Sequence, residues 1–576
     1  MLPGVKEAKA LSNLLQEHPI FRGFRIANVA GDGDEEKDSK DALEEVNKKI
    51  TKHPENTYTI TLSCGRLTTG VTVPPWTAVL MLAGSYSVSA SNYLQTIFRV
   101  QSPANIDGQI KDKCFVFDFA PDRTLKMVAE AGNLSTRPGS NSESSEKQMG
   151  ELLNFCPVIS IEGSLMTAYD VDSMLQQIKR IYAERVVKNG FDDPKLYNDK
   201  LLHLTDLEIE KFTGLKKIVG ASKAAEVNRD ITLSNTGLTK EDRELLEKAK
   251  KKKKGELSEE EKERLEKLKK AKEERGKAIN ILRAISIRIP LMIYGAEIPF
   301  DEDITIENFI DLVDDQSWVE FMPDGVSKDL FRQFMEYYDK DIFIAAGKSI
   351  RALVKGADGL DPTIRVKRLA EIFKTFKNPD KETVLTPWRV VNMHMAETLG
   401  GWEFYAEDHQ EPLDEPRFVD NGDVTMKCLS TDSKVLEINS KSGLYPLYLT
   451  YSIYRERCKT VPEDMLTTEK MLELWQETLD ENVYVICKTK MARAITKRTL
   501  LGYGKGRINA HAFEDLINQF KNKADQVCER VAGSSFWDKK GVNEDMKFDA
   551  IVGNPPYDLE GNNTRKATAS PPVTCF

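Results

Sequence analysis

From about residue 380 onward the chain alternates short apolar runs with helical segments, and this alternation most limits its fold. The runs are Val435–Ile438, Val483–Ile486 and Ala550–Val552. Continuous apolar runs of this length are typical of strands buried on both faces, and the helices between them return the chain to the same edge. The pattern predicts a doubly wound sheet, whose ligands sit at the carboxyl ends of the strands.

The last run lies inside the segment KFDAIVGNPPY, which ends at Tyr557. Gly553 closes the run where the backbone must come close to another group. Asn554 then offers an amide, two prolines fix the chain, and Tyr557 presents an aromatic ring. An exocyclic amine held by two acceptors and stacked on an aromatic face is the arrangement expected of enzymes that act on a flipped-out base.

Composition excludes several other classes of protein. The 576 residues predict three or four domains, and a hydrophobic content of 40% supports ordinary packed cores. We expect no membrane span and, because the N-terminus lacks a signal-peptide layout, a cytoplasmic protein. Eight cysteines and six histidines are scattered without a CxxC pair, which predicts reduced thiols and no metal site. With a net charge of −9, any contact with DNA must come from local patches.

Two earlier segments support a ligand site at the same edge. In KVLEINSKSGL, an apolar strand leads to Glu437, small residues and Gly443 before a helix, as in a nucleotide-type pocket. Ordinary strand–turn–helix packing explains that segment equally well. Thr386 before Pro387 predicts a helix start with proline in the first turn, which suits either a carboxylate ligand or a plain helix cap.

The NPPY segment closely resembles the catalytic motif of amino-methyltransferases that modify adenine in DNA. A Thr-Pro, a cofactor-type loop, a second strand near residue 483 and NPPY follow one another in the order of that adenine-methyltransferase class. The resemblance implies S-adenosylmethionine as cofactor and direct transfer of its methyl group to the adenine N6 amine. It implies the catalytic residues Asn554, Pro555, Pro556 and Tyr557, and the cofactor-binding residues Thr386, Pro387, Glu437, Asn439 and Gly443.

The chain departs from that family at two places. Lys441 stands where a glycine is common in the cofactor loop. Cys487 and Lys488 occupy the end of the second strand, where an acid usually holds the ribose hydroxyls, so we assign no ribose-binding residue there. The segment 513–515 could place a carboxylate near the cofactor adenine, although a surface helix start is the preferred interpretation.

The N-terminal region, 1–131, alternates β-rich runs (Tyr58–Leu62, Thr77–Leu82 and Cys114–Phe119) with helical stretches such as Lys6–Gln16. It resembles the second RecA-like lobe of superfamily 2 helicases. Gly70 and Thr72 match its nucleotide-coupling loop, and Gln95 and Arg99 match its Q…R motif, with Ser102 in place of a usual second arginine. A surface helix residue is an equally good interpretation of Arg99.

No GxxxxGK[ST] phosphate loop and no acidic DExH-type motif occur in the sequence. We therefore expect ATP binding only if a first helicase lobe is supplied elsewhere. Since NPPY lies close to the last residue, and further strands and a target-recognition domain usually follow it, we also expect truncation at both ends. Missing parts of the same enzyme are then expected partners, together with DNA.

The middle of the chain reads as mostly helical. The expected domains are the helicase lobe at 1–131, a flexible loop at 132–150, a helical coupler at 151–378 and a partial Rossmann-like methyltransferase domain at 379–576. Within the coupler, 239–277 predicts a charged helical arm, with capping-box spacing at Thr239 and Ser258. Its run of five lysines, 250–254, suits either a DNA backbone or a solvated turn, and the turn is preferred.

Together these features resemble large single-polypeptide restriction-modification enzymes. The leading hypothesis is an adenine-specific DNA methyltransferase of a restriction-modification system. The alternative is a non-catalytic DNA-binding or translocase-coupling fragment with a vestigial methyltransferase core. The sequence shows no nuclease motif and gives no recognition sequence.

Overall fold

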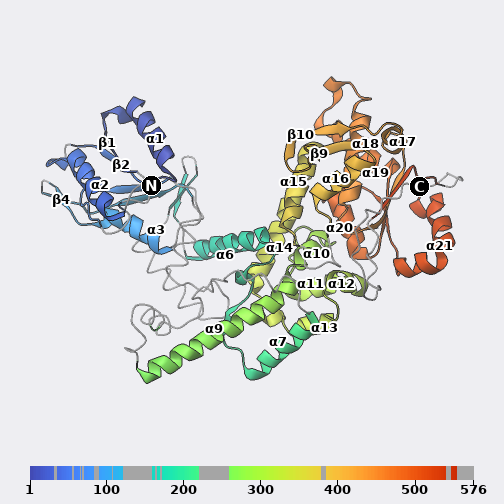
Figure 1. The fold of residues 1–576 in the computed structure, drawn as a ribbon, viewed down its shortest axis with the longest axis horizontal. Helices are drawn as coiled ribbons and strands as arrows, with labels where there is room; N and C mark the ends of the chain where they lie inside the picture. Colours follow the sequence, from blue (N-terminus) through green and yellow to red (C-terminus); the bar gives the residue numbers. More distant parts are fainter. Residues whose placement is uncertain are drawn as a thin grey trace. The chain divides into compact units, whose positions relative to one another are not determined.

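The computed structural model is a mixed α/β protein that is mostly helical (Figure 1). It describes residues 1–30, 35–54, 57–64, 67, 71–82, 90–106, 108–120, 159–162, 165–168, 171–219, 245, 258–377, 385–539 and 546–553. The chain divides into two compact units, Met1–Ile181 and Tyr182–Phe576. The four domains expected from the sequence are not distinguished by this division, so their limits stay predictions.

The N-terminal unit contains short parallel strand pairs flanked by helices. Strand β1 (Arg25–Asn28) pairs with β2 (Thr59–Leu62), and β3 (Ala78–Met81) pairs with β6 (Phe115–Asp118). The runs predicted as strands are therefore confirmed, and so is the first helix. The other elements are α1 (Val5–Glu17), η1 (Phe21–Gly23), α2 (Glu35–Ile50), α3 (Ala90–Ile97), η3 (Phe98–Gln101), β4 (Asn105–Ile106), β5 (Gln109–Ile110), β7 (Ile159–Glu162) and β8 (Leu165–Ala168).

The first part of the second unit is helical, as expected. After α6 (Val171–Lys188), which crosses the boundary between the units, come η4 (Pro194–Leu196), η5 (Asp199–Leu202), α7 (Asp206–Val219), α9 (Glu259–Ser286), α10 (Ile289–Gly295), α11 (Ile306–Leu312), α12 (Asp315–Phe321), α13 (Lys328–Arg332), η8 (Met335–Tyr337), α14 (Lys340–Lys355) and α15 (Pro362–Thr375). Aromatic side chains such as Phe343 and Trp318 fill the space between these helices.

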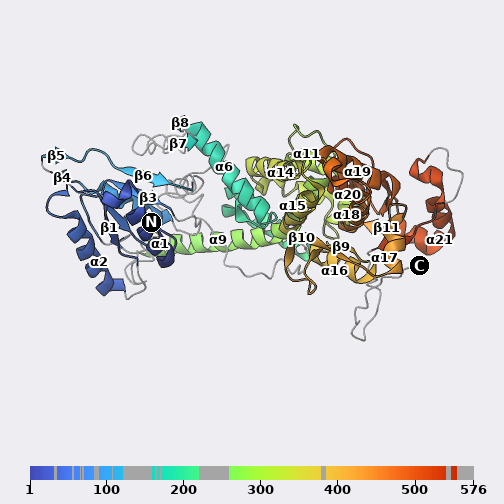
Figure 2. The ribbon, with the colours of Figure 1, turned by 90° about the horizontal axis from the view of Figure 1, so that it is seen from above.

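Helix α9 is long (Figure 1 and Figure 2), and most of its buried residues lie in its last turns, from Arg275 onward. Its start is the predicted capping box: Ser258 Oγ accepts from Glu261 N at 3.1 Å, and Glu261 Oε2 accepts from Ser258 N. Leu265 packs against Leu245 from the preceding part of the arm. The predicted arm ended near residue 277, but the helix continues to Ser286. Its last turns are buried in the helical core.

The helical stretch Glu259–Gly295 contains one window that is long and apolar enough to cross a membrane, although the sequence analysis predicts no span. In the structure 89% of that window is buried inside the protein. Packing within the helical core accounts for its apolar character.

The predicted sheet forms in the C-terminal part. Four parallel strands lie in the order β13 (Asn509–Ala512), β12 (Val483–Cys487), β11 (Val435–Ser440) and β14 (Ala550–Gly553). Helices cover both faces, as in a doubly wound sheet: α18 (Leu444–Cys458) and α20 (Lys490–Leu501) on one, α21 (Leu516–Ala532) on the other (Figure 1). The remaining elements here are η9 (Glu463–Met465), α19 (Thr468–Glu481) and η10 (Ser534–Trp537).

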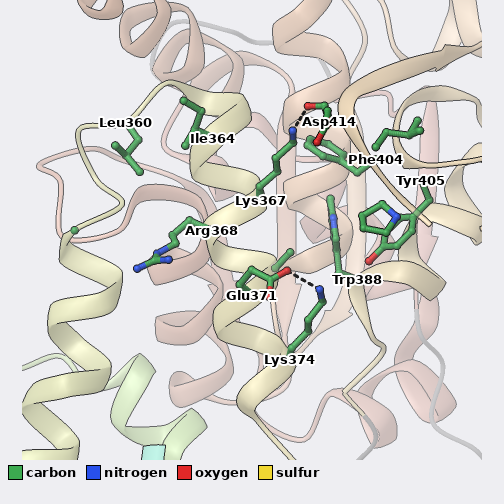
Figure 3. A pocket seen from close by; sticks show the side chains of 14 residues that line it. Leu360, Ile364, Lys367, Arg368, Glu371, Lys374, Trp388, Phe404, Tyr405 and Asp414 are labelled. Carbon is green, nitrogen blue, oxygen red and sulfur yellow. Dashed lines mark hydrogen bonds and ion pairs between the residues drawn. The ribbon is translucent and has the colours of Figure 1, made fainter. Parts of the chain in front are cut away.

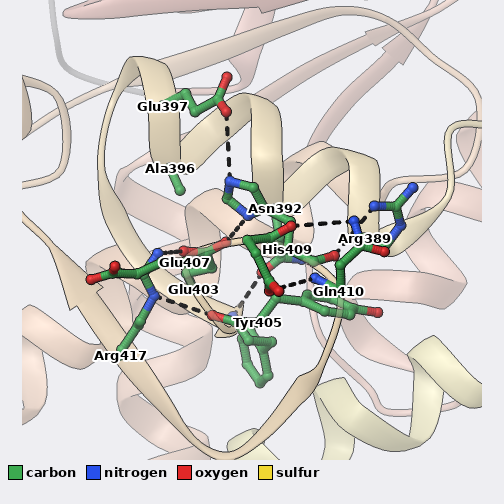
Figure 4. Close-up of polar contacts among 12 residues, drawn as sticks. Arg389, Asn392, Ala396, Glu397, Glu403, Tyr405, Glu407, His409, Gln410 and Arg417 are labelled. Atoms are coloured by element: carbon green, nitrogen blue, oxygen red, sulfur yellow. Dashed lines mark hydrogen bonds and ion pairs between the residues drawn. The ribbon is translucent and has the colours of Figure 1, made fainter.

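A hairpin and two helices precede the sheet: α16 (Trp388–Thr398), β9 (Gly401–Tyr405), β10 (Pro412–Val419) and α17 (Asp423–Cys428). Glu403 is fully buried in the hairpin, where Arg417 Nη2 donates to its Oε2 at 2.5 Å and His409 Nδ1 contacts its Oε1 (Figure 4). A groove of about 560 Å³ runs between α15 and this hairpin and is lined by Lys367, Arg368 and Tyr405 among others (Figure 3).

Candidate functional site

The strand order places a topological switch point beside β11. The chain runs from β11 outward to β12 and β13, then returns to β14 on the other side of β11. Val435 pairs with Val483 on one side and with Ala550 on the other. In open α/β sheets, ligands bind outside the carboxyl ends of the strands at such a reversal. The cofactor-type loop leaves β11 at this edge, and β14 ends there at Gly553, the last described residue before NPPY in the sequence.

Gly553 shows why a glycine ends β14. Its Cα lies opposite Ile438 of β11, and a Cβ at this position would sit 3.1 Å from the Ile438 carbonyl oxygen. The close approach predicted from the sequence is therefore made to the neighbouring strand. The next residues, Asn554, Pro555, Pro556 and Tyr557, lie outside the described residues.

Glu437 is a buried acid on β11, 3% exposed, and its Oε2 has no hydrogen-bond partner. Burial raises the pKa of this carboxyl to about 8, although the Ser440 hydroxyl lowers it. The side chain alternates with Leu436, which packs into the opposite core against α21. Glu437 thus lies on the face covered by α18 and α20 and carries an unsatisfied acceptor.

Two left-handed residues shape the end of β11 and the loop after it. Asn439 has a φ of 68°, and the pairing with β12 shifts register between Ile438 and Ser440. Gly443 has a φ of 75°, and a Cβ there would lie 2.9 Å from the Thr496 Cα in α20. The close approach of Gly443 is therefore to a neighbouring helix, and the same contact lets Thr499 Oγ1 donate to the Ser442 carbonyl at 2.7 Å.

Lys441, the residue that departs from the family's glycine, points toward α12. Its Nζ lies 3.7 Å from Glu320 Oε1 and 5.5 Å from the centroid of the Phe321 ring. Glu320 also accepts from Thr489 Oγ1 at 2.5 Å. Sequence reasoning missed Glu320, because it lies 169 residues before Thr489 in a short helix with no motif of its own.

The end of β12 carries no acid, as the sequence indicates. Cys487 is fully buried and its thiol contacts Thr496 Oγ1 at 3.8 Å. Burial, and then the neighbouring Glu437, raise the pKa of this thiol well above its ordinary value. After β13, Asp515 takes a left-handed conformation at the start of α21 and accepts from Asn518. This is the preferred surface helix start.

The Thr-Pro helix begins one residue later than expected. Helix α16 starts at Trp388 with Pro387 at the N-cap position, and no side chain caps it, so Thr386 is not the cap and the proline precedes the first turn. Two turns further on, His394 Nδ1 contacts the Tyr445 hydroxyl at 2.8 Å. His394 thus joins this helix to the first turn of α18, directly after the cofactor-type loop.

In the N-terminal unit, Arg99 lies on the short helix η3 and its Nη1 donates to the Val71 carbonyl at 2.7 Å. The contact brings the Q…R segment against the loop that carries Thr72, while Gln95 is exposed on α3. Gly70 lies outside the described residues. Arg99 is half-buried, and its guanidinium is hydrogen-bonded to the backbone.

Among the residues that the structure describes, no group of three or more His, Cys, Asp or Glu side chains could hold a metal ion. The site is defined instead by a parallel α/β sheet with a small-residue loop and an unsatisfied acid at its switch point. That is a ligand-binding α/β architecture.

Comparison with known proteins narrows this class. Residues 481–571 match the family model described as Eco57I restriction-modification methylase. This segment runs from the start of β12 past the NPPY residues. This segment is therefore similar to restriction-modification methylases, and the match confirms the resemblance to restriction-modification methyltransferases for these residues.

Two individual proteins are similar to the chain. A putative type II restriction enzyme and methyltransferase from Mycoplasma pneumoniae is 32% identical over 171 residues, which are 28% of this chain and 22% of that protein. The ATP-dependent Type ISP restriction-modification enzyme LlaBIII, solved bound to DNA, aligns over 98% of this chain and 34% of its own at 11% identity. With a TM-score of 0.26, that match does not establish a shared fold. The chain spans no more than about a third of either relative.

Proposed function

We propose that the C-terminal region, 379–576, transfers a methyl group from S-adenosylmethionine to the N6 amine of adenine in DNA, as part of a restriction-modification enzyme. The observation that carries this proposal is the adjacency of β11 and β14 at the switch point. Because the two strands are paired, the start of the cofactor-type loop lies beside the end of β14, which NPPY follows in the sequence. Two segments that are distant in sequence can then serve one reaction centre.

The residues of β11 and of the loop after it fit S-adenosylmethionine, which supplies a methyl group activated on a sulfonium. Glu437 has a buried oxygen without a partner, and a positive group of the ligand beside it would stabilise the ionised carboxylate. Asn439 and Gly443 give the loop its left-handed turns. Thr386 and Pro387 remain the proposed contacts of the ligand carboxylate, through the uncapped start of α16.

The NPPY residues would orient the target base. The Asn554 side-chain oxygen and the Pro555 carbonyl accept the two amine hydrogens, which leaves the nitrogen lone pair directed at the methyl group. Pro556 restricts the backbone, and Tyr557 stacks on the extruded ring. None of these roles needs a covalent nucleophile.

The test is methyl transfer to DNA, with N6-methyladenine identified after digestion. We expect Asn554→Ala to lower the transfer rate at least ~100-fold, as for loss of one transition-state hydrogen bond, while S-adenosylmethionine binding measured by calorimetry is kept. Asn518→Ala, an exposed site on α21, is the matched control and should leave both measurements unchanged. Failure of the wild-type chain to bind S-adenosylmethionine would contradict the cofactor site.

A second candidate function is a DNA-binding or translocase-coupling module with a vestigial methyltransferase core. The contact of Arg99 with the Val71 carbonyl favours it, because it joins the two helicase-like segments of 1–131. In that role the unit would use ATP together with a first lobe, and the helical region 151–378 would act as coupler. Binding of S-adenosylmethionine without any methyl transfer would support this alternative. Either role places the protein with DNA in the cytoplasm.

A further inference from the structure

The end of β12 has no acid of its own, but a carboxylate from another element lies there. Glu320 belongs to α12, and its side chain is 5% exposed. Thr489, two residues past the end of β12, donates its hydroxyl to Glu320 Oε2 at 2.5 Å. Glu320 is also close enough to add to the effects of burial and Glu437 that raise the pKa of the Cys487 thiol.

The same carboxylate faces the loop after β11. Lys441 Nζ lies 3.7 Å from Glu320 Oε1, so the acid lies between two loops that leave neighbouring strands. A second contact fixes α12 in this position, since Met491 N donates to Ser317 Oγ at 3.0 Å. Helix α12 therefore delivers one carboxylate to the carboxyl ends of β11 and β12.

We propose that Glu320 binds the ribose hydroxyls of the methyl donor, in place of the acid that β12 lacks. The inference rests on the proposed function, because it needs S-adenosylmethionine at this edge of the sheet. An ionised carboxylate has about four acceptor positions and no donor. Thr489 occupies one of them, and Lys441 at 3.7 Å lies beyond direct hydrogen-bond distance, so positions remain for a diol.

Two ligands that differ only in the ribose hydroxyls distinguish ribose binding by Glu320 from a purely structural role. S-adenosylhomocysteine and its analogue without the two ribose hydroxyls are titrated into the full chain by calorimetry. The wild-type chain should bind the analogue on the order of ten-fold more weakly, as is usual for lost hydrogen bonds to a charged group. In Glu320→Gln the two ligands should bind within about three-fold of each other, because the two losses are not additive.

The matched control lies on the same helix. Asp315→Asn removes an exposed ion pair with Lys328 and should keep the wild-type discrimination. If Glu320→Gln fails to fold, Glu320→Asp is the second variant, because it keeps the charge but places it farther from the ligand. Its ratio of affinities for the two ligands should fall between that of the wild type and that expected for Glu320→Gln. Unchanged discrimination in the Glu320 variants overturns the inference and leaves the cofactor site standing. No binding of S-adenosylhomocysteine by the wild-type chain overturns the proposed function itself.

Discussion

Two glutamates, Glu403 and Glu437, are buried, and their neighbours offset the cost of burying a carboxylate to different extents. Glu403 contacts both Arg417 and His409, whereas Glu437 has one oxygen without a partner. Burial raises the pKa of both groups, and the Arg417 guanidinium and the His409 ring beside Glu403 oppose that rise. A buried charge is tolerated when it is paired, and an unpaired acid is protonated instead.

The Glu437 pKa gives a pH-dependent stability. Because the folded-state value of about 8 lies above the ordinary value near 4.5, the folded chain binds this proton more tightly than the unfolded chain. Its contribution to stability is complete below about pH 4.5 and is lost as the pH rises through 8. Glu437→Gln should therefore be more stable than wild type by about 4 kcal/mol at pH 8 and by less than about 1 kcal/mol at pH 5. Urea unfolding at both pH values measures this, and a pH-independent difference would contradict it.

For the cluster of Glu403, Arg417 and His409, we predict a variant that lowers stability. Arg417→Ala should lower the free energy of unfolding by about 2 kcal/mol, because it leaves a fully buried carboxylate with less compensation. Solvent reaches Arg417, which is 32% exposed, so the loss is smaller than for a fully buried partner. Adding Glu403→Gln to Arg417→Ala should recover part of the stability in urea unfolding. If the double variant is less stable than Arg417→Ala alone, compensation of the buried charge does not stabilise this cluster.

At the scale of elements, the junction between β11 and α18 depends on Gly443. Gly443→Ala should destabilise the chain by about 2–3 kcal/mol, because it combines a left-handed φ with a Cβ placed 2.9 Å from the Thr496 Cα. Thermal unfolding measures the loss. Gly108→Ala has a similar φ of 79° and open space around it, so this control separates backbone strain from the clash with α20. Equal effects would show that packing on α20 plays no part.

Elements with a strong local signal were predictable from the sequence. The runs at 435, 483 and 550 form strands because continuous apolar runs need burial on both faces. Ser258 and Glu261 form the expected capping box because both partners lie within one turn. The start of α16 and the end of α9 were predicted wrongly, since boundaries depend on what each helix packs against.

At the scale of the whole molecule, contacts between distant segments complete the candidate site. Helix α10 packs along α20, and the Tyr294 hydroxyl contacts Thr499 Oγ1 at 3.0 Å across 205 residues of sequence. Arg365 of α15 donates to the Thr499 carbonyl at 2.8 Å. The helical region and the sheet are therefore packed against each other within the second unit.

The sequence by itself determined the strands, the motif order and the chemical character of NPPY, because these depend on residues that are neighbours along the chain. The tertiary structure alone decided that β14 lies beside β11, that Gly443 is required by α20, and that Glu320 lies at the end of β12. Such placements depend on which elements bury their apolar faces against one another. That choice is made by packing over the whole fold, and no local pattern records it.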